Sequence, residues 1–268
     1  MTHEAHLLAL AGMFVLVLLT LGLWFSYLLA ARRQRRRRSA WSLWRLASFS
    51  LGCALVVLAL SPAMVEWGHS DFRGHTVQHL LLGMFAPIAL MLGAPGTLLL
   101  RSVSVANARR LIVLAGTLPA RCLIHPVTAL LLNIGALYVL YFTPLYQLSF
   151  SEPLLHVLLN LHFVLAGYLF SWSIAGPDPA PHRPGLRTRL AVLFVAVAAH
   201  SIMSKLMYAY GFPRDAGHSL TEIEVASQLM YYGGDLAELL LAVVLFAVWF
   251  RSPARPRTDL PRISTVDG

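Results

Sequence analysis

Long apolar segments recur along the chain, and each is long enough to cross a lipid bilayer as a helix. A transmembrane helix needs about 20 mainly apolar residues. Seven segments meet this length, near residues 6–31, 43–62, 75–100, 126–144, 153–175, 190–210 and 222–250. Only 12% of the 268 residues are charged, whereas soluble domains carry about 25%. The sequence therefore predicts an all-α, polytopic transmembrane bundle of seven spans, with one domain over residues 1–250 and a disordered cytoplasmic tail over 251–268.

Arginine-rich connections predict how these spans are oriented. If the N-terminus is outside, 18 of the 21 Lys and Arg residues fall on the inner side, in residues 32–45, 101–121, 183–189 and 251–262. Cytoplasmic loops are enriched in Lys and Arg, so we expect an outer N-terminus and a cytoplasmic C-terminus in the inner membrane of a bacterial cell. The net charge of +9 arises from these loops and indicates no nucleic-acid partner.

Three further features bear on topology and compartment. The first apolar segment precedes the sequence RRQRRRR instead of following it, so it is predicted to be a span and not a cleaved signal peptide. Residues 111–125 contain Pro119 and Arg121, which predicts an interfacial or re-entrant piece and not an eighth span. Cys53 and Cys122 lack C-x-x-C spacing, which argues against a disulfide framework or a thiol redox site.

Histidines are concentrated toward the outer side of the predicted bundle, where nine of the eleven lie outside the membrane or in the outer half of a span. His75 and His79 are one helical turn apart, so their side chains share a face of the third span. Ionisable side chains at membrane depth are costly and often functional. The candidate metal ligands at that depth are His75, His79, His156, His162 and His200. His69 and His218 are expected to be solvated loop residues.

The last two spans add soft and acidic groups. Met203 and Met207 follow the sixth-span histidine at i+3 and i+7 on one face. The seventh span carries a polar stripe that we expect to face the interior of the bundle, because lipid cannot satisfy it. The stripe consists of Gln228, Tyr231, Asp235 and Glu238. Imidazole and thioether together suit copper, above all Cu(I), and the two acids are expected to orient a ligating imidazole or to carry protons.

Several alternatives remain open from the residues alone. A membrane histidine also serves as a hydrogen-bonding group between helices, and buried methionines also serve as core packing. His162 lies about 120° around its helix from His156, so both cannot face one site without distortion. Pairs of histidines from facing helices would also bind haem in a membrane redox protein. Asp235 and Glu238 would also suit a permease for copper or a small solute.

Several stretches of the chain match the pattern of one known family. HTVQHLLLGMFAPIALMLGAPGTLLLR at 75–101 has the core H-x-x-Q-H-L-L-L, and HP at 125–126, residues 143–172, HSIMSKLMY at 200–208 and SQLMYYGGDLAELLLA at 227–242 follow in order. Over roughly residues 45–250 the chain resembles the CtaG-type family of integral-membrane cytochrome c oxidase assembly factors. Ser227 stands where family members often carry an acid, which leaves Asp235 as the preferred acid.

This resemblance implies a non-enzymatic role in building the copper-containing oxidase. It implies the oxidase catalytic subunit and a periplasmic copper donor as partners, and it carries over the motif histidines His75, His79, His156, His162 and His200. We therefore predict a membrane-embedded factor that binds copper in the outer half of the bundle and assists its delivery to the oxidase copper centre. The supporting residues would be Met203, Met207, Gln228, Asp235 and Glu238. Whether the chain forms a homodimer stays open.

Overall fold

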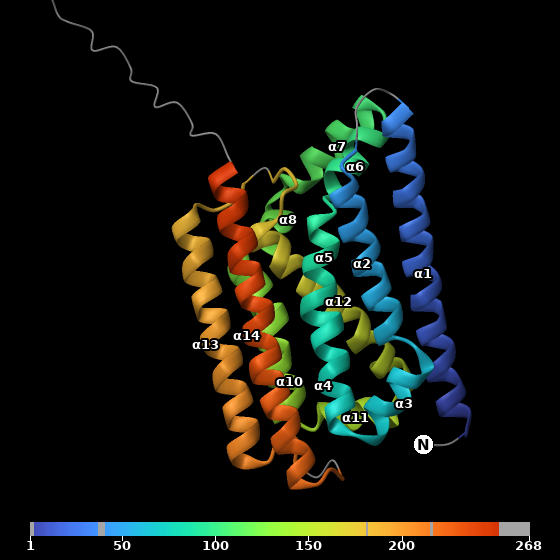
Figure 1. Cartoon of the computed structure of the whole chain (residues 1–268), viewed down its shortest axis with the longest axis vertical. Coiled ribbons are helices and arrows are strands. Elements are labelled where there is room, and N and C mark those ends of the chain that lie inside the picture. The colour runs from blue at the N-terminus through green and yellow to red at the C-terminus, as the bar shows by residue number, and fades with distance from the viewer. Residues whose placement is uncertain (1–2, 37–40, 181, 215–216, 252–268) are drawn as a thin grey trace, which may run out of the picture.

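Helices are the only regular elements in the part of the chain that the computed structural model describes, residues 3–36, 41–180, 182–214 and 217–251 (Figure 1). In chain order they are α1 (His3–Arg36), α2 (Leu43–Ala59), α3 (Pro62–Ser70), α4 (Phe72–Leu80), η1 (Leu81–Phe85), α5 (Ala86–Leu92), α6 (Pro95–Ser102), α7 (Val105–Ala115), α8 (Leu118–Leu123), α9 (Pro126–Leu130), η2 (Leu131–Gly135), α10 (Ala136–Phe142), α11 (Leu145–Ser151), α12 (Pro153–Ala175), α13 (Leu186–Tyr210) and α14 (Leu220–Arg251). The all-helical prediction is confirmed over these residues. Residues 252–268 of the predicted cytoplasmic tail lie outside the described residues.

Five helical segments are long and apolar enough to cross a membrane, namely α1, the continuous segment α4–η1–α5, α12, α13 and α14. Two further candidates are bent at a short break, α2 with α3 by 52° and α9–η2–α10 with α11 by 81°. If each bent pair is one span, the described residues contain up to seven. The number seven and the orientation in the bilayer therefore stay predictions.

The third predicted span, residues 75–100, is shorter than expected. Its helix ends at Leu92 and a new helix, α6, begins at Pro95. Ala94 between them has a left-handed backbone with φ of 51°, a conformation that cannot continue a right-handed helix. The carboxylate of Asp178 then accepts hydrogen bonds from backbone N–H groups in the first turn of α6. The predicted end of this span at residue 100 was wrong for this reason.

The helix ends fall into two layers (Figure 1). One layer, which we call the basic end, contains the last turns of α1 and α14, the first turn of α13 and the short helices α6–α8. The other, which we call the histidine end, contains α3, α11, the last turn of α13 and the first turn of α14. The described parts of the four arginine-rich segments thus share one end of the bundle, as the topology prediction requires. The side of the membrane on which this end lies stays a prediction.

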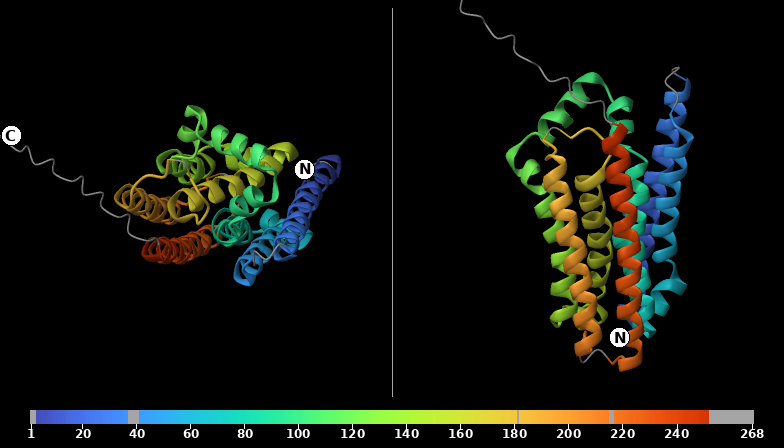
Figure 2. Two further views of the ribbon diagram at one scale, coloured as in Figure 1. Left: turned by 90° about the horizontal axis from the view of Figure 1, so that it is seen from above. Right: turned by 60° about the vertical axis from the view of Figure 1, so that its left-hand side comes forward.

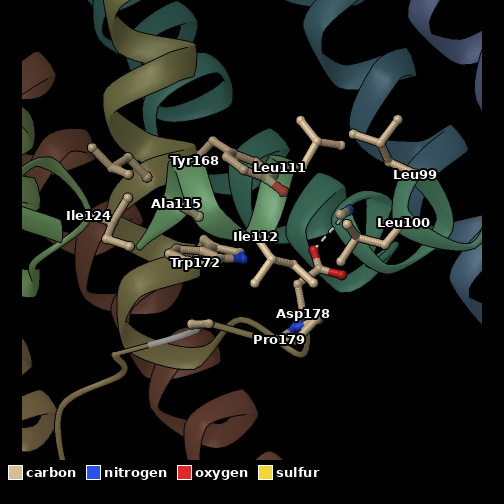
Figure 3. A pocket seen from close by; sticks show the side chains of 13 residues that line it. Leu99, Leu100, Leu111, Ile112, Ala115, Ile124, Tyr168, Trp172, Asp178 and Pro179 are labelled. Carbon is tan, nitrogen blue, oxygen red and sulfur yellow. Dashed lines mark hydrogen bonds between the residues drawn. The ribbon is translucent and has the colours of Figure 1, made fainter. Parts of the chain in front are cut away.

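At the basic end, residues 111–125 form the end of α7 and the helix α8, neither of which has a buried residue. They do not form an eighth long helix. A pocket of about 510 Å³ lies beneath α7, and Figure 3 shows Ile112 of α7 and the α12 residues Tyr168 and Trp172 among the side chains that line it. Its one carboxylate, from Asp178, is used in the hydrogen bonds to α6. The chemistry of this pocket is therefore mainly apolar.

At the centre of the bundle, η1 and α12 approach very closely. A Cβ at Gly167 would lie 2.1 Å from the carbonyl oxygen of Gly83, so only glycine fits there. Pro87 has no N–H to donate to the Gly83 carbonyl four residues earlier, and the helix widens into the π-helical turn η1 at this point. Such turns frequently occur at functional sites. His79 lies two residues before η1 begins.

Candidate metal site at the histidine end

Four histidines and four aromatic residues gather at the histidine end. This histidine–aromatic cluster consists of His69, His75, His156, His218, Phe72, Tyr141, Tyr146 and Phe150. The rings of His69 and His156 have centroids 4.7 Å apart, and Phe150 contacts both, at 5.3 and 6.1 Å. Phe72 stacks on both His75 and His218, with ring centroids 6.1 and 5.3 Å apart, and Phe150 also contacts His75 at 6.1 Å. Residues far apart in the sequence thus form one site.

A tight turn between α3 and α4 brings His69 and His75 together. Asp71 lies in this turn and caps α4, because its carboxylate accepts hydrogen bonds from the backbone N–H of Arg73 at 2.8 Å and from the Arg73 guanidinium. The hydrogen bonds from Arg73 lower the pKa of Asp71. Gly74 allows the two helices to approach, since a Cβ there would lie 2.6 Å from the backbone of α3.

His75 lies within the cluster without a hydrogen-bond partner among the residues that the structure describes. The residue is 6% exposed, and neither ring nitrogen bonds to a described residue. The Nε2 atom of His156 is also without such a partner. His218 differs, because its Nε2 pairs with the Tyr146 hydroxyl at 2.9 Å. Buried polar groups normally have partners, so the nitrogens of His75 and His156 are available to a ligand.

A second pair of histidines, which we call the deep pair, lies further along the bundle. His79 and His200 are 1% and 0% exposed. Their helices, α4 and α13, pack on the same stretch of α14, where Leu80, next to His79, contacts Gly233 and the His200 ring contacts Gly234. All four ring nitrogens are without a hydrogen-bond partner among the described residues. Gly234 makes room for His200 against α14, because a Cβ there would lie 2.0 Å from the ring. His79 packs edge-on against Phe163, with ring centroids 4.8 Å apart.

His162 joins neither group. Its Nε2 pairs with the backbone carbonyl oxygen of Leu132 at 2.9 Å, and Leu132 belongs to the π-helical turn η2. The predicted angular offset from His156 on the same helix explains why the two rings have different surroundings. The structure therefore gathers four of the five candidate histidines into two groups and pairs the fifth with a neighbouring helix.

The candidate supporting residues have different surroundings. Met203 and Met207 are 0% exposed and belong to the hydrophobic core. Glu238 is buried, and both carboxylate oxygens lack a hydrogen-bond partner among the described residues. Asp235 accepts a hydrogen bond from the Ser201 hydroxyl at 3.3 Å. Of the two acids, only Glu238 therefore resembles the buried histidines in having polar atoms without a hydrogen-bond partner among the described residues.

The polar stripe of α14 does not face the interior as a whole. Gln228 is exposed and lines a groove between α13 and α14, which contradicts the prediction for this residue. Positions ten residues apart differ by about 80° around a helix with 3.6 residues per turn. Glu238 can therefore face the core while Gln228 faces outward.

Among the described residues, no group of three or more His, Cys, Asp and Glu side chains is arranged to hold a metal ion. A metal bound here would depend on pairs of imidazoles. The sequence interpretation missed His69 and His218, which it treated as solvated. Ser61 before Pro62 and Asp71 before α4 are helix-capping signals, and together they could have predicted two short helices that turn His69 toward the site.

Comparison with known proteins connects this arrangement to one family. An uncharacterized protein of Mycobacterium leprae is 29% identical over 249 residues, which are 86% of this chain and 38% of that protein. Uncharacterized proteins of Mycobacterium bovis and Mycobacterium tuberculosis are each 34% identical over 174 residues, which are 62% of this chain and 26% of those proteins. The chain thus spans well under half the length of these curated relatives.

No solved structure matches the chain. The family described as cytochrome c oxidase caa3 assembly factor matches residues 25–252. This range includes every helix that contributes to the histidine–aromatic cluster and to the deep pair. By this match, the chain belongs to the cytochrome c oxidase caa3 assembly factor family.

Proposed function

We propose that the chain holds copper, as Cu(I), on the imidazoles of its histidine end and assists its delivery to cytochrome c oxidase. Family membership supports a role in assembly of the oxidase, and the apolar helices support a location in the membrane. The proposal adds the copper, the oxidase catalytic subunit as its acceptor and a periplasmic protein as its donor. It involves no enzymatic turnover.

One observation carries the copper proposal. Seven ring nitrogens of four buried histidines lack a hydrogen-bond partner among the described residues, and they belong to His75, His79, His156 and His200. An unpaired buried polar group costs about 1–3 kcal/mol, so a ligand that binds these nitrogens recovers that free energy. Imidazole is a good ligand for copper. Cu(I) accepts low coordination numbers, so pairs of rings suffice to hold it.

In this proposal the two histidine groups have different functions. His75 and His156, with His69 beside them, would take up copper at the end of the bundle. The deep pair, His79 and His200, would hold it away from water. His75 and His79 lie on one helix face about 6 Å apart, so copper can pass from one group to the other inside the protein.

Copper loading of the purified full chain tests this proposal. Wild type loaded anaerobically with Cu(I) should retain copper through gel filtration, measured as copper per chain by elemental mass spectrometry. The double variant His75→Leu/His156→Leu should lose the share held by the cluster. The matched control His162→Leu should retain it, because that ring is already paired with Leu132.

Three results would contradict the proposal. Equal copper content in the double variant and in wild type would remove the histidine–aromatic cluster from consideration. A Soret band in the purified chain would assign the imidazoles to haem instead. In cells grown at low copper, deletion of the chain should lower the copper content of the oxidase, and an unchanged oxidase would contradict the delivery step.

A further inference from the structure

A polar groove of about 440 Å³ lies between α13 and α14, which run side by side along one edge of the bundle (Figure 2). Its walls carry Lys205, Tyr208, Gln228, Tyr231 and Tyr232. Both helices are long and apolar enough to span a membrane, and their other outward side chains include Phe194 and Leu236, which are 74% and 52% exposed. The groove is therefore a polar strip on a flank that otherwise suits lipid.

The polar groups of this groove have few partners within the described chain. The Gln228 amide and the hydroxyls of the three tyrosines make no hydrogen bond with a described residue. The Nζ atom of Lys205 lies 5.2 Å from the ring centroid of Tyr231, and no described carboxylate lies within ion-pair distance of it. Polar and charged groups at membrane depth are costly without a partner, so a partner from outside the chain is expected.

Lys205 lies inside α13, five residues before its last residue, Tyr210. The backbone of Lys205 therefore lies about 7.5 Å along the helix axis from the end of α13 at Tyr210. Ser201 contacts Asp235 and Lys205 contacts Tyr231. The two antiparallel helices therefore place Lys205 and Tyr231 at a similar height in the bundle. The ammonium group of Lys205 lies toward the neighbouring helix α14, beside the Tyr231 ring.

We propose that the groove docks a transmembrane helix of the protein that receives copper, and that this helix carries a carboxylate opposite Lys205. The identity of that protein, the oxidase catalytic subunit, rests on the proposed function. A carboxylate complements the charge of Lys205, and the unpaired amide and hydroxyl groups supply further hydrogen bonds to the helix. Ser204 and Ser227 form the buried floor of the groove, where small residues let α13 and α14 approach each other closely.

One wall of the groove lies one helical turn along α13 from His200. The Ser204 hydroxyl donates a hydrogen bond to the His200 backbone carbonyl at 3.1 Å, so a helix in the groove would lie about one helical turn from His200. An anionic lipid headgroup could pair with Lys205 alone. The hydroxyl and amide groups that line the groove lie at several heights along α13 and α14. A transmembrane helix can contact all of these heights, whereas a lipid headgroup would contact one, so a helix is the favoured occupant.

The chain offers a direct test because Lys205 is its only lysine. The full chain, co-expressed in membranes with the oxidase catalytic subunit, is treated with a hydrophobic carbodiimide. This reagent joins an amine to a carboxylate as an amide with loss of water. The expected product is a crosslinked peptide that joins Lys205 to an Asp or Glu in a transmembrane segment of the subunit. A crosslink through the N-terminal amine would give a different peptide.

Two substitutions separate the charge of Lys205 from its reactivity. Lys205→Arg keeps the positive charge without the amine, so it should keep co-purification of the subunit and lose the crosslink. Lys205→Gln should lower co-purification about tenfold or more, because truncating one member of a hydrogen-bonded charge pair weakens complexes strongly. Copper loading of the isolated Lys205→Gln chain should match wild type, which also shows that this variant folds.

Two results would overturn the docking proposal. One is equal co-purification of the subunit with wild type and with a folded Lys205→Gln chain. The other is loss of bound phosphatidylglycerol from Lys205→Gln in native mass spectrometry with unchanged co-purification, which would assign the groove to lipid. A Lys205 crosslink to the subunit in a chain that binds no copper would contradict the copper proposal alone and leave the docking intact.

Discussion

Replacing His75 with leucine tests whether its ring nitrogens are unpaired in the metal-free chain. Leucine has a similar volume and no polar atoms in its side chain. Removing an unpaired buried polar group should relieve about 1–3 kcal/mol. Leucine loses the edge-on contacts of the imidazole with Tyr141 and Tyr146. The two contacts together are worth about 1 kcal/mol. We therefore expect His75→Leu to stabilise the metal-free chain by about 1 kcal/mol.

Thermal unfolding in detergent under anaerobic conditions, followed by tryptophan fluorescence, measures this change. In a chain of this size, 1 kcal/mol shifts the unfolding midpoint by about 2–4 °C. The matched control His162→Leu should lower the midpoint by a similar amount, because it removes a hydrogen bond worth about 1 kcal/mol. Cu(I) at about 100 times its dissociation constant should stabilise wild type by about 2.7 kcal/mol and should stabilise His75→Leu less.

Two outcomes would refute the reasoning about His75. If His75→Leu lowers the midpoint of the metal-free chain as much as His162→Leu does, the imidazole is satisfied within the bundle. If Cu(I) raises the midpoints of wild type and His75→Leu equally, the ring does not hold the metal. The first outcome concerns the energetics of the buried nitrogens and the second concerns the ligand, so the two are separable.

Further predictions concern residues that position the site. Gly234→Ala should displace the His200 ring and lower the unfolding free energy by about 1–3 kcal/mol, measured by thermal unfolding, whereas the control Gly22→Ala, with open space around it, should be neutral or stabilising. Gly167→Ala should cost more than Gly234→Ala in the same assay, because its Cβ meets backbone instead of a side chain. Asp71→Asn should cost about 0.5 kcal/mol or less at neutral pH. Since the pKa of Asp71 is lowered from 3.8, its contribution is present above about pH 4 and lost as pH falls through the lowered pKa, so the variant should flatten the midpoint-against-pH curve below pH 4.

The helices could be predicted from the sequence because apolar length alone determines where a membrane helix can form. The break after Leu92 could not be placed from that pattern, because the apolar residues continue to Leu100. What ends the helix is local backbone geometry at Ala94 together with capping by Asp178, more than 80 positions later in the chain. A hydropathy pattern contains neither kind of information.

The candidate site was predictable where one helix decides the geometry. His75 and His79 share a face because they are four residues apart, and both are buried. The partners of a ring on another helix are not predictable in this way. The carbonyl that pairs with His162 comes from η2, and His69 reaches the cluster only through the turn between α3 and α4. Such contacts depend on how helices pack, which residue spacing within one helix does not encode.

The location of these histidines in α4 is itself informative. Among the five long span candidates, α4–η1–α5 is the most enclosed, with 72% of its most apolar stretch buried inside the bundle, against 17–39% for the others. A helix surrounded by protein can carry polar side chains on any face, and Gln78 uses this to donate a hydrogen bond to the Ala59 carbonyl at 2.9 Å. His75 and His79 have no comparable partner among the described residues, so packing alone does not account for them. Their position is explained if the rings serve a ligand that must be kept from water, and Cu(I), which oxygenated water readily oxidises, is such a ligand.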